Sequence, residues 1–206
     1  MITVMAGAPS IHTHDEWNSR TTGRSYAPDA IQVRKGEDAA AMQILGAKPI
    51  WLNLWDRIYL NGKSHDELTI ARALTPVLMI EKVSSMVAPL GIAHGDHVTV
   101  SNACLSVAVE LGIPVYLYSD MPYALECSEA VQLRINELSR DGLEIRALDN
   151  IGATGATKKR IFKSYRSQYK PIRRGHPNFE QSMAAPEQYW QVLMKQQQRR
   201  PQPPSE

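Results

Sequence analysis

The 206-residue chain has few cysteines, no long apolar run and no strong excess of charge of either sign. Its two cysteines, Cys104 and Cys127, exclude a disulfide-rich scaffold and indicate a protein with reduced thiols. No stretch approaches the ~20 apolar residues of a membrane-spanning helix, and the first residues lack the basic and apolar regions of a secretory signal. The net charge of +2 and the apolar fraction of 43% are ordinary for a globular protein. We therefore expect a cytoplasmic protein without a membrane span.

Charge is distributed unevenly along the chain. Residues 150–206 hold eleven basic and three acidic residues, and a run without acid between residues 151 and 179 could bind nucleic acid or anionic lipid. Apolar and aromatic side chains interleave with this run at helical spacing, which favours a packed helix, so no nucleic acid partner is expected. Residues 195–206 are polar and of low complexity and are predicted to form a disordered tail. Residues 1–194 are predicted to form a single domain.

Strand patterns alternate with helix patterns along the chain. The predicted strands are residues 2–5, 49–54, 83–89, 114–118 and 143–148, and the predicted helices are residues 29–45, 64–74, 97–111, 128–138, 158–169 and 187–194. This alternation predicts an α/β fold with a Rossmann-like, mainly parallel sheet flanked by helices. Functional residues are then expected in the loops at the carboxyl ends of the strands.

The segment of residues 88–97 carries the chemistry that such a loop needs. It follows an apolar strand and opens a helix, and it contains His94, Asp96 and His97. Histidines three residues apart can share a helix face, and a neighbouring carboxylate can orient an imidazole. Imidazole also ligates zinc and can stabilise an oxyanion. The pattern fits metal-dependent hydrolysis, and it equally fits two histidines that open a helix whose positive end favours Asp96.

This loop resembles the second motif of the PIG-L (LmbE-like) zinc-dependent N-deacetylases, usually written His-Pro-Asp-His. Further weak similarities follow in the order of that family: residues 3–9, Trp17, Gly23, Arg34 with Glu37 and Asp38, Trp51 to Tyr59, Tyr118-x-Asp120-x-Pro122-Tyr123, and the segments around Tyr165 and Tyr189. The resemblance covers roughly residues 2–193. It implies hydrolysis of an N-acetyl group from an amino sugar or glycoconjugate, with Zn²⁺ as the cofactor.

The resemblance also implies roles for individual residues. His97 corresponds to a zinc ligand, His94 to the histidine that assists at the transition state, and Asp96 to the aspartate that tunes that histidine. Arg34 and Asp56 correspond to residues that contact the sugar, although each could equally form a surface ion pair.

The family's first motif, His-Pro-Asp-Asp, has no counterpart in the chain, and the first strand of the fold is missing with it. The segment with His12, His14 and Asp15 offers similar ligand types, but it lies where the family has a variable loop. We expect the reading frame to extend upstream of Met1 and to encode an apolar strand with this motif. Two hypotheses remain: a zinc-dependent deacetylase, or a non-catalytic remnant or binding protein with the same fold.

Overall fold

The computed structural model describes residues 1–10, 13–14, 16–148 and 155–194, so the predicted tail lies outside the described residues. The helices are α1 (Glu16–Thr22), α2 (Ala27–Leu45), η1 (Arg57–Leu60, a 3-10 helix), α3 (Glu67–Ile80), α4 (Gly95–Leu111), α5 (Tyr123–Glu126), α6 (Ser128–Arg140), α7 (Gly155–Phe162), α8 (Arg166–Gly175) and α9 (Phe179–Ala184). The strands are β1 (Ile2–Thr3), β2 (Ile50–Trp51), β3 (Met86–Pro89), β4 (Val115–Tyr118), β5 (Leu143–Leu148) and β6 (Tyr189–Met194). Within these ranges, no helix combines the length and apolar character needed to cross a bilayer.

The strands form two separate sheets. β1 and β2 make a small parallel pair in which Ile2 lies opposite Ile50. The larger sheet has the order β3–β4–β6–β5, with β3 parallel to β4 and β6 antiparallel to both of its neighbours. The predicted α/β fold with helices around a sheet is confirmed. The sheet is mixed rather than mainly parallel, because β6 inserts between β4 and β5 in the opposite direction.

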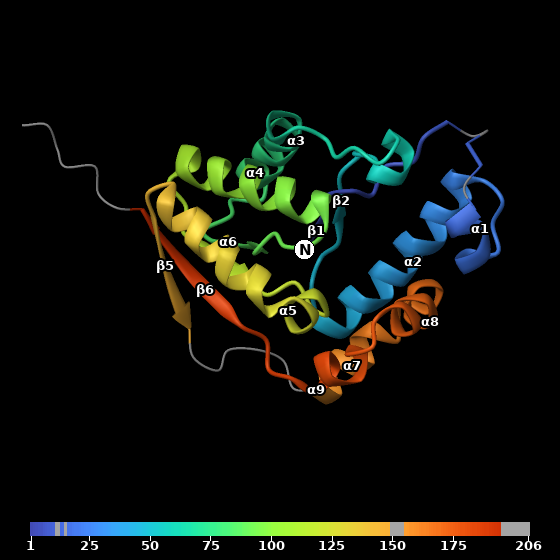
Figure 1. The fold of residues 1–206 in the computed structure, drawn as a ribbon. Helices are drawn as coiled ribbons and strands as arrows, with labels where there is room; N and C mark the ends of the chain where they lie inside the picture. The colour runs from blue at the N-terminus through green and yellow to red at the C-terminus, as the bar shows by residue number, and fades with distance from the viewer. Residues whose placement is uncertain (11–12, 15, 149–154, 195–206) are drawn as a thin grey trace, which may run out of the picture.

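The helices lie in two groups around the sheets (Figure 1). α4 packs on β3 and α6 packs on β5, while α3 lies against α4. In the second group α2 contacts α1 and α7, and α8 contacts α1 and α9. Ile70, Leu90, Val107 and Leu117 are fully buried, so the hydrophobic core lies between the larger sheet and the first group of helices.

The two ends of helix α4 are set by residues at its caps. It ends at Gly112, whose φ of 65° lies in the left-handed region and whose N–H donates to the carbonyl of Val109. The predicted stop at this glycine is confirmed. The helix begins at Gly95, two residues before the predicted start at His97, so His94 occupies the N-cap position.

Residues 187–194, predicted as a helix, contain strand β6 instead. Trp190 and Val192 are buried and alternate with the half-buried Tyr189 and Gln191, which is the two-residue period of a strand. The predicted helix over residues 158–169 is also wrong as one element. It is divided between α7 and α8, which are separated at residues 163–165.

Helix α3 differs from its prediction at both ends. Its N-cap is Asp66 rather than Ser64, and the Asp66 carboxylate accepts a hydrogen bond of 2.8 Å from the backbone N–H of Thr69. The helix then continues through Pro76 to Ile80 instead of ending near Leu74. Leu74 and Leu78 are both buried, so the packing on either side of Pro76 outweighs the loss of one helical hydrogen bond.

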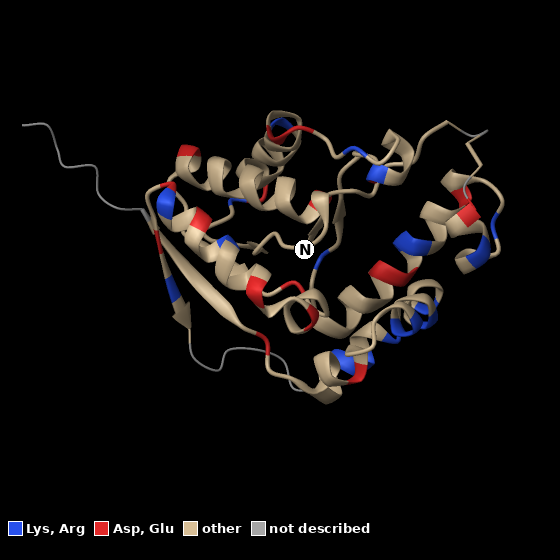
Figure 2. Cartoon of the chain, in the orientation of Figure 1, with Lys and Arg blue, Asp and Glu red and all other residues tan. Residues whose placement is uncertain are grey.

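The aromatic residues of the basic segment pack together as predicted. Phe162 lies 5.2 Å from Phe179 and 5.9 Å from Tyr169 between ring centroids. Figure 2 shows lysines and arginines along α7 and α8. One of them, Lys158, is buried and donates hydrogen bonds of 2.9 Å to the carbonyls of Ser182 and Ala185.

Candidate active site

The loop after β3 turns sharply to deliver two histidines to the start of α4. Gly91 has a φ of 86°, and a Cβ atom on it would lie 2.8 Å from the Cβ of Ser101. Only glycine therefore lets the loop lie this close to α4. Ala93 is also left-handed, with a φ of 61°, so the chain reverses just before His94.

His94 and His97 face one another at the beginning of α4. Their ring centroids are 5.2 Å apart and their planes are inclined by 51°. The Nδ1 atom of His97 lies 3.0 Å from Oδ1 of Asp120. The imidazole is 40% exposed while the carboxylate is completely buried, so Nε2 is the ring nitrogen left for a ligand.

Asp120 lies two residues after β4 and fixes the position of the loop as well as the histidine. Its Oδ2 atom accepts hydrogen bonds from the backbone N–H groups of Gly91, at 2.8 Å, and Ile92, at 3.3 Å. A carboxylate on the far nitrogen orients an imidazole and raises its basicity as a ligand. The sequence prediction missed this role, although the position of Asp120 just after a buried strand was the signal that could have found it.

Asp96 is buried in the first turn of α4, and its Oδ2 accepts a hydrogen bond of 3.3 Å from the backbone N–H of Arg57. Burial and the neighbouring His97 lower the pKa of His94 below its usual range, and the charges of Asp96 and Asp56 oppose this shift. Both carboxylates therefore lie close enough to influence His94. The predicted role of Asp96 as the residue that tunes His94 stays a prediction.

Asp56 has a local structural function. Its Oδ1 accepts a hydrogen bond of 2.9 Å from the backbone N–H of Ile58 and caps η1. The backbone N–H of the next residue, Arg57, bonds Asp96, so Asp56 lies beside the first turn of α4. The structure thus brings four of the predicted residues together: His94, Asp96, His97 and Asp56.

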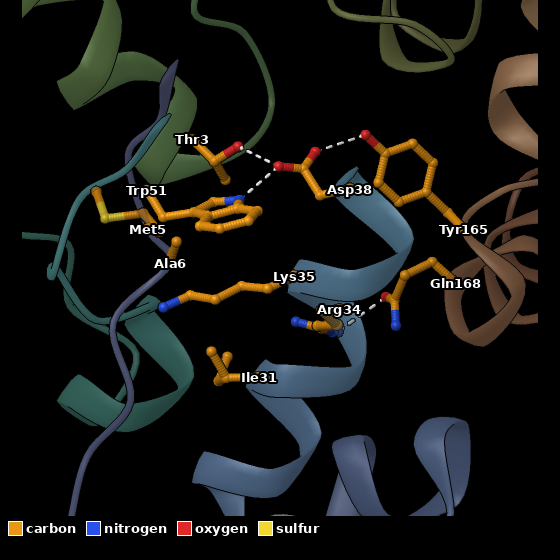
Figure 3. A pocket seen from close by; sticks show the side chains of 10 residues that line it. All are labelled: Thr3, Met5, Ala6, Ile31, Arg34, Lys35, Asp38, Trp51, Tyr165 and Gln168. Carbon is orange, nitrogen blue, oxygen red and sulfur yellow. Dashed lines mark hydrogen bonds between the residues drawn. The ribbon is translucent and has the colours of Figure 1, made fainter. Parts of the chain in front are cut away.

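Arg34 lies elsewhere, in a pocket of about 210 Å³ beside α2 (Figure 3). Its Nη2 atom donates a hydrogen bond of 2.8 Å to Gln168. The centre of this pocket is Asp38, which accepts hydrogen bonds from three side chains. The donors are Thr3 at 3.1 Å, Trp51 at 2.6 Å and Tyr165 at 2.8 Å. These bonds hold α2 against both strands of the small sheet and against the segment before α8.

Aromatic and histidine side chains from later in the chain extend the site. The ring of Tyr123 lies edge-on to His97 at 5.8 Å between centroids and to His176 at 5.2 Å. The Nδ1 of His176 lies 2.9 Å from the Glu126 carboxylate. Neither Tyr123 nor His176 was predicted as a site residue. Tyr123 reaches His97 from the start of α5, and His176 reaches Tyr123 from the end of α8, so both contacts depend on tertiary packing.

The described residues do not complete a metal site. Within ranges 1–10, 13–14, 16–148 and 155–194, no group of three or more His, Cys, Asp and Glu side chains is placed to hold a metal ion. His97 with Asp120 behind it fits one zinc ligand and its orienting carboxylate, whereas a catalytic zinc site takes three protein ligands. His12 and Asp15 lie outside the described residues, and His14 forms an isolated bridge with Tyr26.

Comparison with known proteins gives a likeness in fold. No family model and no curated protein matches the chain. A crystal structure of a deacetylase complex from the teicoplanin biosynthesis pathway is similar over 95% of this chain and 87% of its own, with a TM-score of 0.75 and 22% identity. The A40926 pseudoaglycone deacetylase Dbv21 is similar over 94% of this chain and 84% of its own, with a TM-score of 0.72 and 23% identity. A zinc-inhibited form of teicoplanin deacetylase Orf2 has a TM-score of 0.70 and 21% identity, over 95% of this chain and 87% of its own.

Proposed function

We propose that the chain is the scaffold of a hydrolase of the PIG-L (LmbE-like) type that removes the acetyl group from an N-acetylated amino sugar or glycoconjugate in the cytoplasm. The observation that carries the proposal is the pair of histidines at the start of α4, with the Asp120 carboxylate 3.0 Å behind His97. The similarity in fold to deacetylases supports it.

The roles of the side chains follow from their positions. Zn²⁺ is the ion proposed for His97, because imidazole is a zinc ligand and Asp120 leaves Nε2 available. Among the described residues, the proposal assigns the ion one ligand, His97. The other roles in the proposed reaction belong to side chains that do not bind the ion. In this proposal His94, whose ring lies 5.2 Å from that of His97, donates a hydrogen bond to the oxyanion of a tetrahedral intermediate or a proton to the departing amine.

Asp56 and Arg34 are the residues proposed to contact the substrate. Asp56 lies near His94 and can accept a hydrogen bond from a sugar hydroxyl with the Oδ2 atom that does not cap η1. Arg34 reaches the sugar only if the substrate extends into the pocket beside α2. A binding protein without catalysis is the second candidate, and the observation in its favour is the absence of a three-ligand cluster among the described residues.

The test is amine release from an N-acetylglucosamine derivative by the full gene product, together with its zinc content after dialysis. We expect His97→Ala to lose zinc. His94→Ala is expected to retain zinc and to lose turnover by a factor of ~10²–10³, which is typical of one oxyanion donor. His65→Ala is the matched control, because His65 bonds only the backbone N–H of Trp55 in the described structure.

Equal zinc content in His97→Ala and the parent would show that the ligand is wrongly assigned. Unchanged turnover in His94→Ala would remove that residue from the chemistry. A gene product that binds the acetylated sugar without releasing amine would favour the binding protein.

A further inference from the structure

A recess lined by basic side chains lies between α2 and the break that separates α7 from α8. Its volume is about 480 Å³, within the range of about 300–1,000 Å³ that is common for small-molecule sites. Its basic side chains are Arg160 in the last turn of α7, Lys163 in the break and Arg166 at the start of α8. We refer to this recess as the basic cleft.

Helix α2 turns opposite faces to the basic cleft and to the pocket that contains Arg34. The cleft is lined by Val33, Gly36, Glu37 and Ala40, and the pocket by Ile31, Arg34, Lys35 and Asp38. The two sets have the same spacing and are offset by two positions, which is about 200° around a helix of 3.6 residues per turn. The basic cleft is therefore separate from that pocket.

The three cations of the basic cleft differ from their neighbours in the basic segment. Lys159 and Arg173 both contact the Glu180 carboxylate, at 3.6 Å and 3.1 Å. Within the part of the chain that the structure describes, the side chains of the three cleft cations form neither an ion pair nor a hydrogen bond, and all three are exposed. Like charges around one recess raise its positive potential, which favours an anionic ligand.

The carboxylate of Glu37 only partly offsets this charge. Its two oxygens accept hydrogen bonds of 2.7 Å each from the backbone N–H and the hydroxyl of Ser167, in the first turn of α8. Three cations and one carboxylate give the cleft a net charge of +2. A phosphate monoester carries about −1.5 to −2 charge at pH 7, so its charge matches that of the cleft. Guanidinium groups bind phosphate oxygens through paired N–H donors, and the hydroxyl of Ser164 is a further donor in the lining.

Gly36 keeps the α2 wall of the cleft open. Glycine is unfavourable inside a helix, and Gly36 lies in the middle of the 19-residue α2. A Cβ atom on it would meet no heavy atom within 4 Å outside its own helix, so no packing contact requires glycine there. Together with the exposed Ala40, Gly36 forms a wall without long side chains, and the organic part of a ligand can lie against it.

We propose that the basic cleft binds a small phosphorylated molecule. Arg160, Lys163 and Arg166 surround the phosphate group, and the organic part lies against Gly36 and Ala40. The cleft is larger than a phosphate ion, so an ester such as a sugar phosphate fits it better than inorganic phosphate does. None of the candidate site's histidines lines the cleft, so binding there does not depend on the proposed deacetylase activity.

Calorimetric titration of the purified protein with glucose 6-phosphate, inorganic phosphate and glucose tests the proposal at physiological ionic strength. Glucose 6-phosphate should bind, inorganic phosphate should bind more weakly, and glucose should not bind. Arg166→Gln should lower the affinity for glucose 6-phosphate by about tenfold or more, because a charge-assisted contact is lost. Arg174→Gln is the matched control, since Arg174 is an exposed arginine of the same helix that does not line the cleft. It should leave the affinity unchanged.

A second pair of substitutions tests the organic part of the ligand without changing charge. Gly36→Leu fills the open wall and should weaken binding of glucose 6-phosphate by about tenfold, with little effect on inorganic phosphate. Gln32→Leu is its control, because Gln32 is exposed on α2 and does not line the cleft. Neither change should lower the melting temperature, since leucine is a good helix former.

Several results would overturn the proposal. If neither phosphate compound binds, or if the two arginine variants weaken binding equally, the cleft is not a phosphate site. Equal affinity for glucose 6-phosphate and inorganic phosphate, or an equal effect of the two leucine variants, would contradict the contact with the organic part. Binding of RNA or anionic vesicles that both arginine variants weaken to the same extent, without binding of glucose 6-phosphate, would assign the basic segment to a larger polyanion.

Discussion

Asp120 determines the geometry of the candidate site at the scale of single residues. One of its oxygens accepts two backbone hydrogen bonds from the loop after β3, and the other faces His97. A buried carboxylate with these contacts ties three elements together: the end of β4, the loop and the first turn of α4. The same residue therefore supports the fold and places a carboxylate oxygen beside Nδ1 of His97.

Two substitutions of Asp120 should separate these effects. Asp120→Ala leaves the buried N–H groups of Gly91 and Ile92 unpaired and should lower the free energy of unfolding by about 2–4 kcal/mol. Asp120→Asn keeps an acceptor for these groups but directs an N–H₂ donor at Nδ1 of His97, which moves the ring proton to Nε2 and blocks metal binding there.

Chemical denaturation and zinc titration of both variants measure this difference. Asp120→Asn should retain most of the stability and lose about 10–100-fold in zinc affinity. If both variants lose stability equally and bind zinc like the parent, Asp120 has only a structural role.

At the scale of elements, Lys158 connects α7 to α9 and to the segment before β6. This buried lysine of α7 donates to the carbonyls of Ser182 and Ala185, which lie at the end of α9 and just after it. Its Nζ also lies 3.5 Å from the Glu187 carboxylate, just before β6. The basic segment thus includes one lysine that stabilises the fold among others that lie on the surface.

Lys158→Ala should lower the free energy of unfolding by about 2–3 kcal/mol, because the buried carbonyl of Ser182 and the partly buried carbonyl of Ala185 lose a charged donor. Lys159→Ala is the control. The Lys159 side chain is 47% exposed and lies 3.6 Å from Glu180, so its loss should cost about 0–1 kcal/mol. Denaturant unfolding of the two variants compares them, and equal midpoints would contradict the structural role of Lys158.

At the scale of the whole molecule, the described strands form two separate sheets with a groove between them. The groove leaves strand edges of β1 and β3 unpaired among the described residues. In the candidate site beside it, the described residues bring together no group of three or more His, Cys, Asp and Glu side chains that could hold a metal ion. The unpaired edges and the incomplete ligand set lie in the same region. We therefore expect low stability and weak metal binding to occur together.

The 206-residue chain should therefore bind zinc weakly, release no appreciable amine from an N-acetylglucosamine derivative and aggregate readily. One imidazole cannot fix the geometry of the ion, and unpaired edges invite association. Zinc content after dialysis, amine release and light scattering check the three expectations. Stoichiometric zinc with robust turnover would contradict this prediction and would assign ligands to the segment with His12, His14 and Asp15.

The sequence by itself determined the local elements around the site. The apolar run before Pro89, the glycine at position 91 and the stop at Gly112 predict a strand, a loop and a helix, and the structure has them. The proximity of His94 and His97 follows from their spacing, because residues three apart lie on one helix face. These are short-range consequences of backbone geometry and of hydrophobic periodicity.

Tertiary structure decided the partners that are distant in sequence. Asp120 meets His97 across 23 positions only because β4 lies beside β3, and residues 189–194 become a strand because β4 and β5 offer edges on both sides. Arg34, predicted to contact the sugar, lies in the pocket beside α2 and donates a hydrogen bond to Gln168 of α8. Such contacts depend on which surfaces the whole chain buries together, and no local pattern of residues encodes that choice.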